Sequence, residues 1–373
     1  MQNETAKTKI YYIDNLRILM TVLVILHHTL ISYGAPGGWY FTDATTNKPA
    51  LMIMTLVVAT NQSFFMGFFF FLSAYFTEPS YNKKGAFKFC TDRLKRLGIP
   101  LLFYSFILGP FMNFLIYKYA LHKEASFLQY LSGYDDWIDF GVLWFVAALL
   151  LFTFVYLLLK QKKAEIQKCI PFPTSKQILV FAILLGFVSY AVRIFFPIGW
   201  VLHPLGFQLA HFPQYISLFF FGIIAYRNQW MSNIPSGIGK RWGITAMLLV
   251  LIAFPVLIFL INGQLDKVMG NGTPQSLLVA LWEQLTGISV IVALSGFAMY
   301  RWNRTTPLLQ AASRAAFATY IFHPLIVISA TLLLLPWQAD PALKLLIAAP
   351  CTITLSFCMG WLITRLPVAR NIV

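Results

Sequence analysis

The feature that most restricts this sequence is a series of ten apolar stretches, each close to the length that crosses a lipid bilayer. A transmembrane helix needs about 20 predominantly apolar residues. The stretches lie near residues 15–34, 51–77, 98–118, 141–160, 178–197, 212–227, 242–262, 276–300, 315–336 and 342–364. We therefore predict an all-α, polytopic membrane protein with about ten transmembrane helices in a lipid bilayer.

The composition agrees with this fold class. Hydrophobic residues make up 58% of the 373 residues and charged residues 11%, whereas soluble domains carry about 25% charged residues. The loops are too short for a separate soluble domain, so we predict a single transmembrane domain over residues 1–373. The first stretch follows Lys7 and Lys9 without a small-residue cleavage site, and we interpret it as a retained signal anchor.

The net charge of +15 could suggest a nucleic-acid partner, but the basic residues sort by side of the membrane instead. Most Lys and Arg residues precede the first stretch or follow the even-numbered stretches. The opposite side holds few of them, namely Lys48, Lys118, Lys123, Lys267 and Lys344. Because cytoplasmic loops are enriched in Lys and Arg, we predict that both termini are cytoplasmic and expect no nucleic-acid partner.

Two ionisable residues, Arg17 and His28, lie within the first apolar stretch. At about 100° per residue they fall on one helix face, roughly 16 Å apart along the axis. Ionisable groups inside a bilayer are costly and usually functional. We therefore predict that Arg17 and His28 form a functional pair, with His27 on a different face in a secondary role.

A carboxylate, Glu283, and a second arginine, Arg193, are expected in the outer half of the membrane at a depth similar to that of His28. A carboxylate that accepts a hydrogen bond from one imidazole nitrogen leaves the other free to take a proton. Glu283 is therefore a candidate partner of His28. An ion pair between Glu283 and Arg193 that holds two helices together is an equal alternative.

Further polar residues lie in the ninth stretch and before the third. His323 follows Tyr320 by one helical turn, and it could form an interhelical hydrogen bond or contact a substrate. Arg93 and Arg96, with Lys95 between them, could bind a phosphate or could simply mark the cytoplasmic side. None of the six histidines has a spacing such as H-E-x-x-H, so we predict no metal site.

These residues lie in segments that resemble the acyltransferase 3 superfamily of membrane acyltransferases. The matching segments are in the family's order and span most of the chain. They are Arg17-x10-His28, Phe68 to Tyr75 (with Ala74 where Gly is usual), Arg93-Leu-Lys-Arg96, Leu143-Trp144-Phe145 and Tyr320-x-x-His323-Pro324. The most similar subgroup includes glucan-succinylating proteins, which lack an attached extracytoplasmic hydrolase-like domain.

The resemblance implies a bacterial plasma-membrane enzyme that moves an acyl group, acetyl or succinyl, from cytoplasmic acyl-CoA to a hydroxyl of an envelope glycan or related acceptor outside. It implies that Arg17 and His28 are the essential pair. Arg93 and Arg96, and with them Lys95, become candidate contacts for the CoA phosphates. His323 becomes a candidate catalytic residue. Acyl-CoA is expected as a donor substrate, with no permanently bound cofactor.

Two questions about the chemistry remain open from the sequence. His28 could be a general base for the acceptor hydroxyl, or it could carry the acyl group transiently. A different class of protein, a proton-coupled transporter or flippase, could use the same buried Arg, His and Glu residues as a proton relay.

Overall fold

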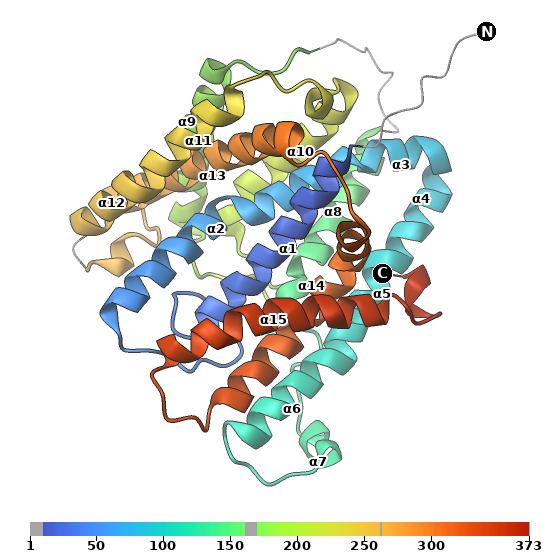
Figure 1. Ribbon diagram of the computed structural model, residues 1–373, viewed down its shortest axis with the longest axis vertical. Helices are drawn as coiled ribbons and strands as arrows, with labels where there is room; N and C mark the ends of the chain where they lie inside the picture. The colour runs from blue at the N-terminus through green and yellow to red at the C-terminus, as the bar shows by residue number, and fades with distance from the viewer. Residues whose placement is uncertain (1–9, 161–169, 262, 373) are drawn as a thin grey trace.

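The computed structural model describes residues 10–160, 170–261 and 263–372, which form a bundle of helices (Figure 1). Lys7 and Lys9, which flank the predicted signal anchor, lie outside these residues. The helices are α1 (Tyr11–Ser32), α2 (Lys48–Tyr75), α3 (Thr77–Lys84), α4 (Ala86–Arg93), α5 (Ile99–Phe103), α6 (Gly109–Tyr119), α7 (Phe127–Ser132), α8 (Trp144–Lys160), α9 (Ser175–Phe195), α10 (Phe212–Arg227), α11 (Ile238–Leu248), α12 (Phe254–Ile261), α13 (Pro274–Arg301), α14 (Pro307–Leu334) and α15 (Pro341–Ile363).

Within the described ranges, ten helical segments are long and apolar enough to cross a membrane, and each overlaps one predicted stretch. The described residues contain no strand, and their one β-bridge joins Leu202 to Phe207. The all-α fold with about ten membrane-spanning helices is thus confirmed. The side of the membrane on which each terminus lies stays a prediction.

The second and third spans are longer than predicted. The helical segments run over Lys48–Lys84 and Ala86–Tyr119, because α3 and α4 continue beyond the apolar residues as charged helices. Gly85 separates α3 from α4 with a φ of +74°, a left-handed conformation that glycine adopts without a steric penalty. Apolar length alone cannot locate such polar extensions.

In the part of the chain that the structure describes, three short π-helical segments interrupt the spans at positions that prolines explain. They are η1 (Leu94–Gly98), η2 (Tyr104–Leu108) and η6 (Leu249–Ala253). Each contains the residue four positions before a proline, because Pro100, Pro110 and Pro255 follow them closely. A proline ring collides with the carbonyl of the residue four positions before it, and a widened turn relieves that collision. Arg96 lies in the first of these widened turns.

Helix α1 lies in the middle of the bundle, where it packs against α2, α13, α14 and α15 (Figure 1). Two glycines allow close packing nearby: a Cβ on Gly222 of α10 would lie 2.3 Å from the Phe71 carbonyl of α2, and one on Gly287 of α13 would lie 1.9 Å from the Ser63 carbonyl. Small residues at such crossings are typical of membrane helices. Helices α2 and α13, which contact α1, are therefore closely packed against their neighbours.

Candidate functional site

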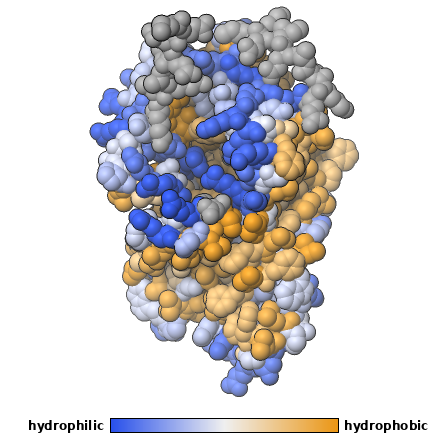
Figure 2. Space-filling view, turned by 90° about the vertical axis from the view of Figure 1, so that its right-hand side faces the viewer, coloured by the Kyte–Doolittle hydropathy of each residue, from blue (hydrophilic) through white to orange (hydrophobic). Residues whose placement is uncertain are grey.

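A cavity of about 1180 Å³ opens at the end of the bundle where α1 begins. Residues of α1 to α4, η1, α8, α10 and α14 line it. Figure 2 shows the face that bears α3 and α4, and hydrophilic residues surround a hollow in its upper part, above a mostly hydrophobic surface. Deeper in the bundle, the cavity reaches Thr21, Val146 and Tyr320. It therefore extends from a polar rim into the membrane-spanning core.

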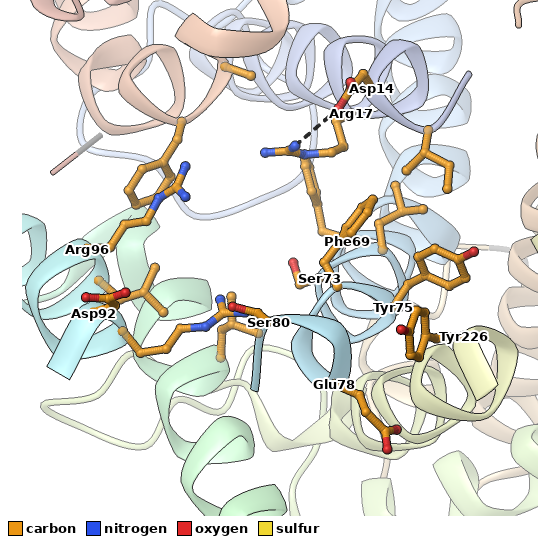
Figure 3. A pocket seen from close by; sticks show the side chains of 18 of the residues that line it. Asp14, Arg17, Phe69, Ser73, Tyr75, Glu78, Ser80, Asp92, Arg96 and Tyr226 are labelled. Carbon is orange, nitrogen blue, oxygen red and sulfur yellow. Dashed lines mark ion pairs between the residues drawn. The ribbon is translucent and has the colours of Figure 1, made fainter. Parts of the chain in front are cut away.

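The cavity is rich in cationic side chains. Figure 3 shows Arg17 and Arg96 pointing into the same open space from opposite sides. The guanidinium of Arg93 lies 5.1 Å from the centre of the Phe89 ring. The structure thus brings together three predicted site residues from two distant segments. The cations that line the cavity are Arg17, Lys84, Arg93, Arg96 and Arg227.

The carboxylates of the cavity neutralise some of these cations but not all. Arg17 lies 3.5 Å from Asp14, and Lys84 lies 2.7 Å from Asp92. Within the described ranges, neither Arg93 nor Arg96 has a carboxylate partner. These two guanidinium groups are therefore available to an anionic ligand, for which arginine offers bidentate hydrogen bonds.

The structure does not bring Lys95, the third predicted phosphate contact, together with Arg93 and Arg96. Lys95 is exposed and lies outside the cavity lining formed by the described residues. Adjacent residues of a helix leave it in directions about 100° apart. Because Arg96 faces the cavity, its neighbour faces away from it.

A buried carboxylate, Glu78, connects three helices at the cavity, namely α3, α8 and α10. Its side chain is 4% exposed, and it accepts hydrogen bonds from Lys160 at 2.8 Å and from Nε of Arg227 at 2.6 Å. Arg227 also lines the cavity. Sequence reasoning did not identify this group, because its residues come from three separate helices and each resembles ordinary cytoplasmic charge.

Farther along α1, His28 meets His323 of α14. Nδ1 of His28 lies 2.8 Å from Nε2 of His323, which is fully buried. Nδ1 of His323 lies 2.7 Å from the Tyr320 carbonyl oxygen. A carbonyl can only accept a hydrogen bond, so Nδ1 of His323 must carry the proton and Nε2 of a neutral His323 must accept.

This order of hydrogen bonds fixes the tautomer of His28. Its Nδ1 must donate to His323, and its Nε2 therefore carries the lone pair. Within the part of the chain that the structure describes, no hydrogen bond involves this Nε2. The histidine pair thus leaves Nε2 of His28 free to take a proton. His323 holds the place for which the sequence suggested the carboxylate of Glu283.

The two imidazoles belong to a group of four neighbouring aromatic rings. Tyr320 and His323 have ring centres 5.7 Å apart, and His323 and His28 have centres 5.1 Å apart. The indole of Trp39 covers a face of His28, with centres 4.4 Å apart and planes 18° apart, whereas His323 meets His28 at its edge through the 2.8 Å nitrogen contact. Tyr320 also lines the cavity. This group of rings therefore extends from the wall of the cavity to the loop that follows α1.

The cavity and the histidine pair are adjacent but not continuous. In the described residues, the lining stops at Thr21 and Tyr320 and includes neither His28 nor His323. His28 lies seven residues beyond Thr21, or about 10 Å along the helix. Tyr320 joins the two regions, because its ring lines the cavity and its carbonyl orients His323.

The expected contact between Glu283 and His28 is wrong. Glu283 accepts hydrogen bonds from the fully buried Arg193 at 2.7 Å and from His211 at 3.1 Å. The alternative ion pair is the one that forms, because α13 directs this carboxylate towards α9 and the start of α10. His211, which the sequence did not single out, is buried beside this pair.

Tyr40, the neighbour of Trp39 on the same loop, forms a hydrogen bond with Tyr104 of η2. The Tyr40 and Tyr104 hydroxyls are 2.6 Å apart. Burial raises the pKa of Tyr40 above its ordinary value, so this hydroxyl stays protonated. Gly141, with a φ of +43°, leaves the space for both tyrosines, because a Cβ there would lie 2.1 Å from the Tyr40 hydroxyl.

The chain is similar to proteins of one known family. A profile of the acyltransferase domain family matches residues 10–364. Glucans biosynthesis protein C of Escherichia coli (strain SMS-3-5 / SECEC) is 30% identical over 148 residues, which are 38% of this chain and 37% of that protein. Its counterpart from Salmonella heidelberg (strain SL476) is 28% identical over 193 residues, or 49% and 48% of the two chains. The matched segments thus cover less than half of these relatives, and no solved structure matches.

Proposed function

Because the chain belongs to the family of membrane acyltransferases whose domain profile it matches, we propose that it moves an acyl group from acyl-CoA to a hydroxyl outside the cytoplasm. The observation that carries the proposal is the junction at Tyr320. There, a cation-lined cavity meets a histidine pair with a defined basic nitrogen. We place the enzyme in the plasma membrane of a bacterium, as a multi-pass protein.

The cavity suits the nucleotide end of the donor. Small-ligand pockets have volumes of about 300 to 1,000 Å³, so a cavity of about 1180 Å³ accommodates a large ligand. CoA carries several phosphate charges, and among the arginines that line the cavity in the described residues, Arg93 and Arg96 are the two without a carboxylate partner. Arg17 and Arg227 add positive charge at the same cavity. We assign the phosphates to this group of arginines.

The histidine pair suits the transfer step. Nε2 of His28 takes the proton of the acceptor hydroxyl as the oxygen attacks the thioester carbonyl carbon. The carbon–sulfur bond then breaks, and His28 returns the proton to the departing sulfur. The products are an ester and the free CoA thiol. His323 holds the His28 tautomer and is placed to share the positive charge that forms on the pair.

The same nitrogen also permits a route through an acyl-histidine. In that route Nε2 attacks the thioester carbon first, and the acceptor oxygen attacks the resulting acyl-imidazole. Rapid quenching after mixing with labelled acetyl-CoA distinguishes the routes, because label that stays on His28 in the absence of acceptor indicates the covalent one.

The acceptor is proposed from the relatives. Their name, glucans biosynthesis protein C, supports a glucan as the molecule that provides the hydroxyl. We propose that this glucan belongs to the cell envelope and that the acyl group is acetyl or succinyl. A mass-spectrometric comparison of envelope glycans from cells with and without the protein tests this assignment. A missing mass increment of the acyl group on a glucan would identify acceptor and acyl group together.

The central test uses the purified protein in lipid nanodiscs with acetyl-CoA and succinyl-CoA. We expect release of the CoA thiol by the natural protein and none above background by His28→Ala. His27→Phe is the matched control, because His27 is also buried but packs against Phe65. Equal thiol release by His28→Ala and the natural protein would contradict the proposal and favour the alternative, a proton-coupled transporter.

A further inference from the structure

The loop between α1 and α2 is fastened at both ends. The backbone amide of Asp43 donates to the Ser32 carbonyl at 2.8 Å, and that of Thr45 donates to the Tyr33 carbonyl at 3.1 Å. The end of the loop is thus bonded back onto the end of α1. Residues 34–42 form a closed loop whose tip carries Trp39.

Two side-chain contacts attach the same loop to α15 and the residue that caps it. Lys344, which is 3% exposed, lies 2.8 Å from the Asp43 carboxylate. The Thr45 hydroxyl donates to Asp340 at 2.7 Å. A buried ion pair of this kind constrains geometry strongly, because separating it leaves an uncompensated charge away from water. The loop is therefore held over the end of α1 from two sides.

Trp39 covers His28 through its ring face alone. Its indole nitrogen is buried and, within the described part of the chain, has no hydrogen-bond partner. The ring stacks on His28 and meets Tyr40 edge-on at 5.2 Å between centres. It also packs against both hydrophobic clusters that flank the end of α1. No polar bond explains its position, so its role lies in the surface that it covers.

We propose that Trp39 is a positioning residue that fixes the orientation of the His28 imidazole. Its indole also keeps water from the face of His28 on which it stacks. The inference rests on the proposed acyl transfer. Water competes with the acceptor hydroxyl, because attack of water on the thioester carbon gives a free carboxylic acid and the CoA thiol. Exclusion of water from an active site suppresses such side reactions. Trp39 thereby favours transfer over hydrolysis.

The first test measures release of the CoA thiol from acetyl-CoA without acceptor, with the full-length protein in nanodiscs. We expect Trp39→Ala to raise this hydrolysis several-fold and to leave the KM for acetyl-CoA unchanged, since the cationic cavity is untouched. Trp39→Phe keeps a flat ring and should behave like the natural protein. Trp200→Ala is the matched control, because Trp200 is 38% exposed and packs against Phe196 rather than against a histidine.

A second measurement does not depend on acyl transfer. Diethyl pyrocarbonate modifies accessible histidines, and mass spectrometry locates the product. We expect faster modification of His28 in Trp39→Ala than in the natural protein or in Trp200→Ala. Equal modification rates would overturn the role of Trp39, even if acyl transfer is confirmed. Faster modification without any thiol release by the natural protein would instead uphold the shielding by Trp39 and overturn the proposed acyl transfer.

Discussion

His28 and His323 are 295 positions apart in the sequence, yet their ring nitrogens lie 2.8 Å apart where α1 packs against α14. The contact joins the first helix to the fourteenth. It gives the two imidazoles one shared hydrogen-bond order, which ends at the Tyr320 carbonyl. His28 therefore depends on α14 for its tautomer, and the proposed chemistry depends on both helices.

Replacing His323 tests this dependence. His323→Ala removes the acceptor for Nδ1 of His28, so both tautomers of His28 become populated and its orientation is lost. We expect kcat to fall by about 100-fold or more, within the range for general acid–base groups. His323→Gln offers an amide oxygen to the same proton and should recover part of the loss. Equal kcat values for the two variants would contradict the tautomer argument.

Replacing the free arginines tests the donor site. We expect Arg93→Ala combined with Arg96→Ala to raise the KM for acyl-CoA at least tenfold, or about 1.4 kcal/mol of lost binding, with a small effect on kcat. Lys95→Ala is the control, since Lys95 is exposed outside the cavity lining. Steady-state kinetics at two salt concentrations checks the result. An unchanged KM in the double variant would indicate that these arginines do not bind the donor and only mark the cytoplasmic side.

The buried ion pair between Glu283 and Arg193 leads to a prediction about the stability of the protein. Glu283→Gln leaves the fully buried Arg193 without its charge partner. Loss of one partner from a buried pair costs about 3–5 kcal/mol. We expect a lower thermal unfolding temperature and a lower yield of folded protein in detergent. Joint replacement by Glu283→Leu and Arg193→Met should restore much of the stability, whereas lost turnover with normal stability would assign Glu283 to the reaction.

Helix packing gives a fourth prediction. Gly222→Ala places a Cβ 2.3 Å from the Phe71 carbonyl, so α10 and α2 must separate. Overpacking of this kind costs about 1–3 kcal/mol or more. Gly243→Ala is the matched control, because its Cβ would lie at an ordinary 3.8 Å from Ala293. Thermal unfolding of both variants checks the prediction, and a Gly222→Ala protein as stable as Gly243→Ala would show that the crossing is looser than described.

The sequence predicted the spans well because hydropathy is a local property that each segment carries by itself. The sequence also sufficed to place Arg17 and His28 on one helix face, since this follows from the angle per residue within one helix. The full lengths of the second and third spans were missed. Their ends are charged helices, and nothing in their apolar content extends that far.

Contacts between helices were harder to predict. Glu283 and His28 were paired on membrane depth, but depth does not specify which face of a helix meets which neighbour. The partner of His28 proved to be His323, for which a hydrogen bond to another helix was one of two alternatives. Trp39 was missed because a tryptophan near the end of a span usually marks the membrane interface. Its place over an imidazole depends on a loop fold that composition does not encode.

The position of Arg17 and His28 on one uninterrupted helix has a consequence for donor choice. No hinge separates the two residues, so the distance between the cationic end and the basic nitrogen, roughly 16 Å along the axis, cannot shorten. Under the proposed function, a donor must span that distance between its phosphates and its reactive carbonyl. Acetyl phosphate, in which the two groups share an oxygen atom, is too short to engage both ends at once. The geometry of α1 thus selects donors by molecular length, whichever acyl group they carry.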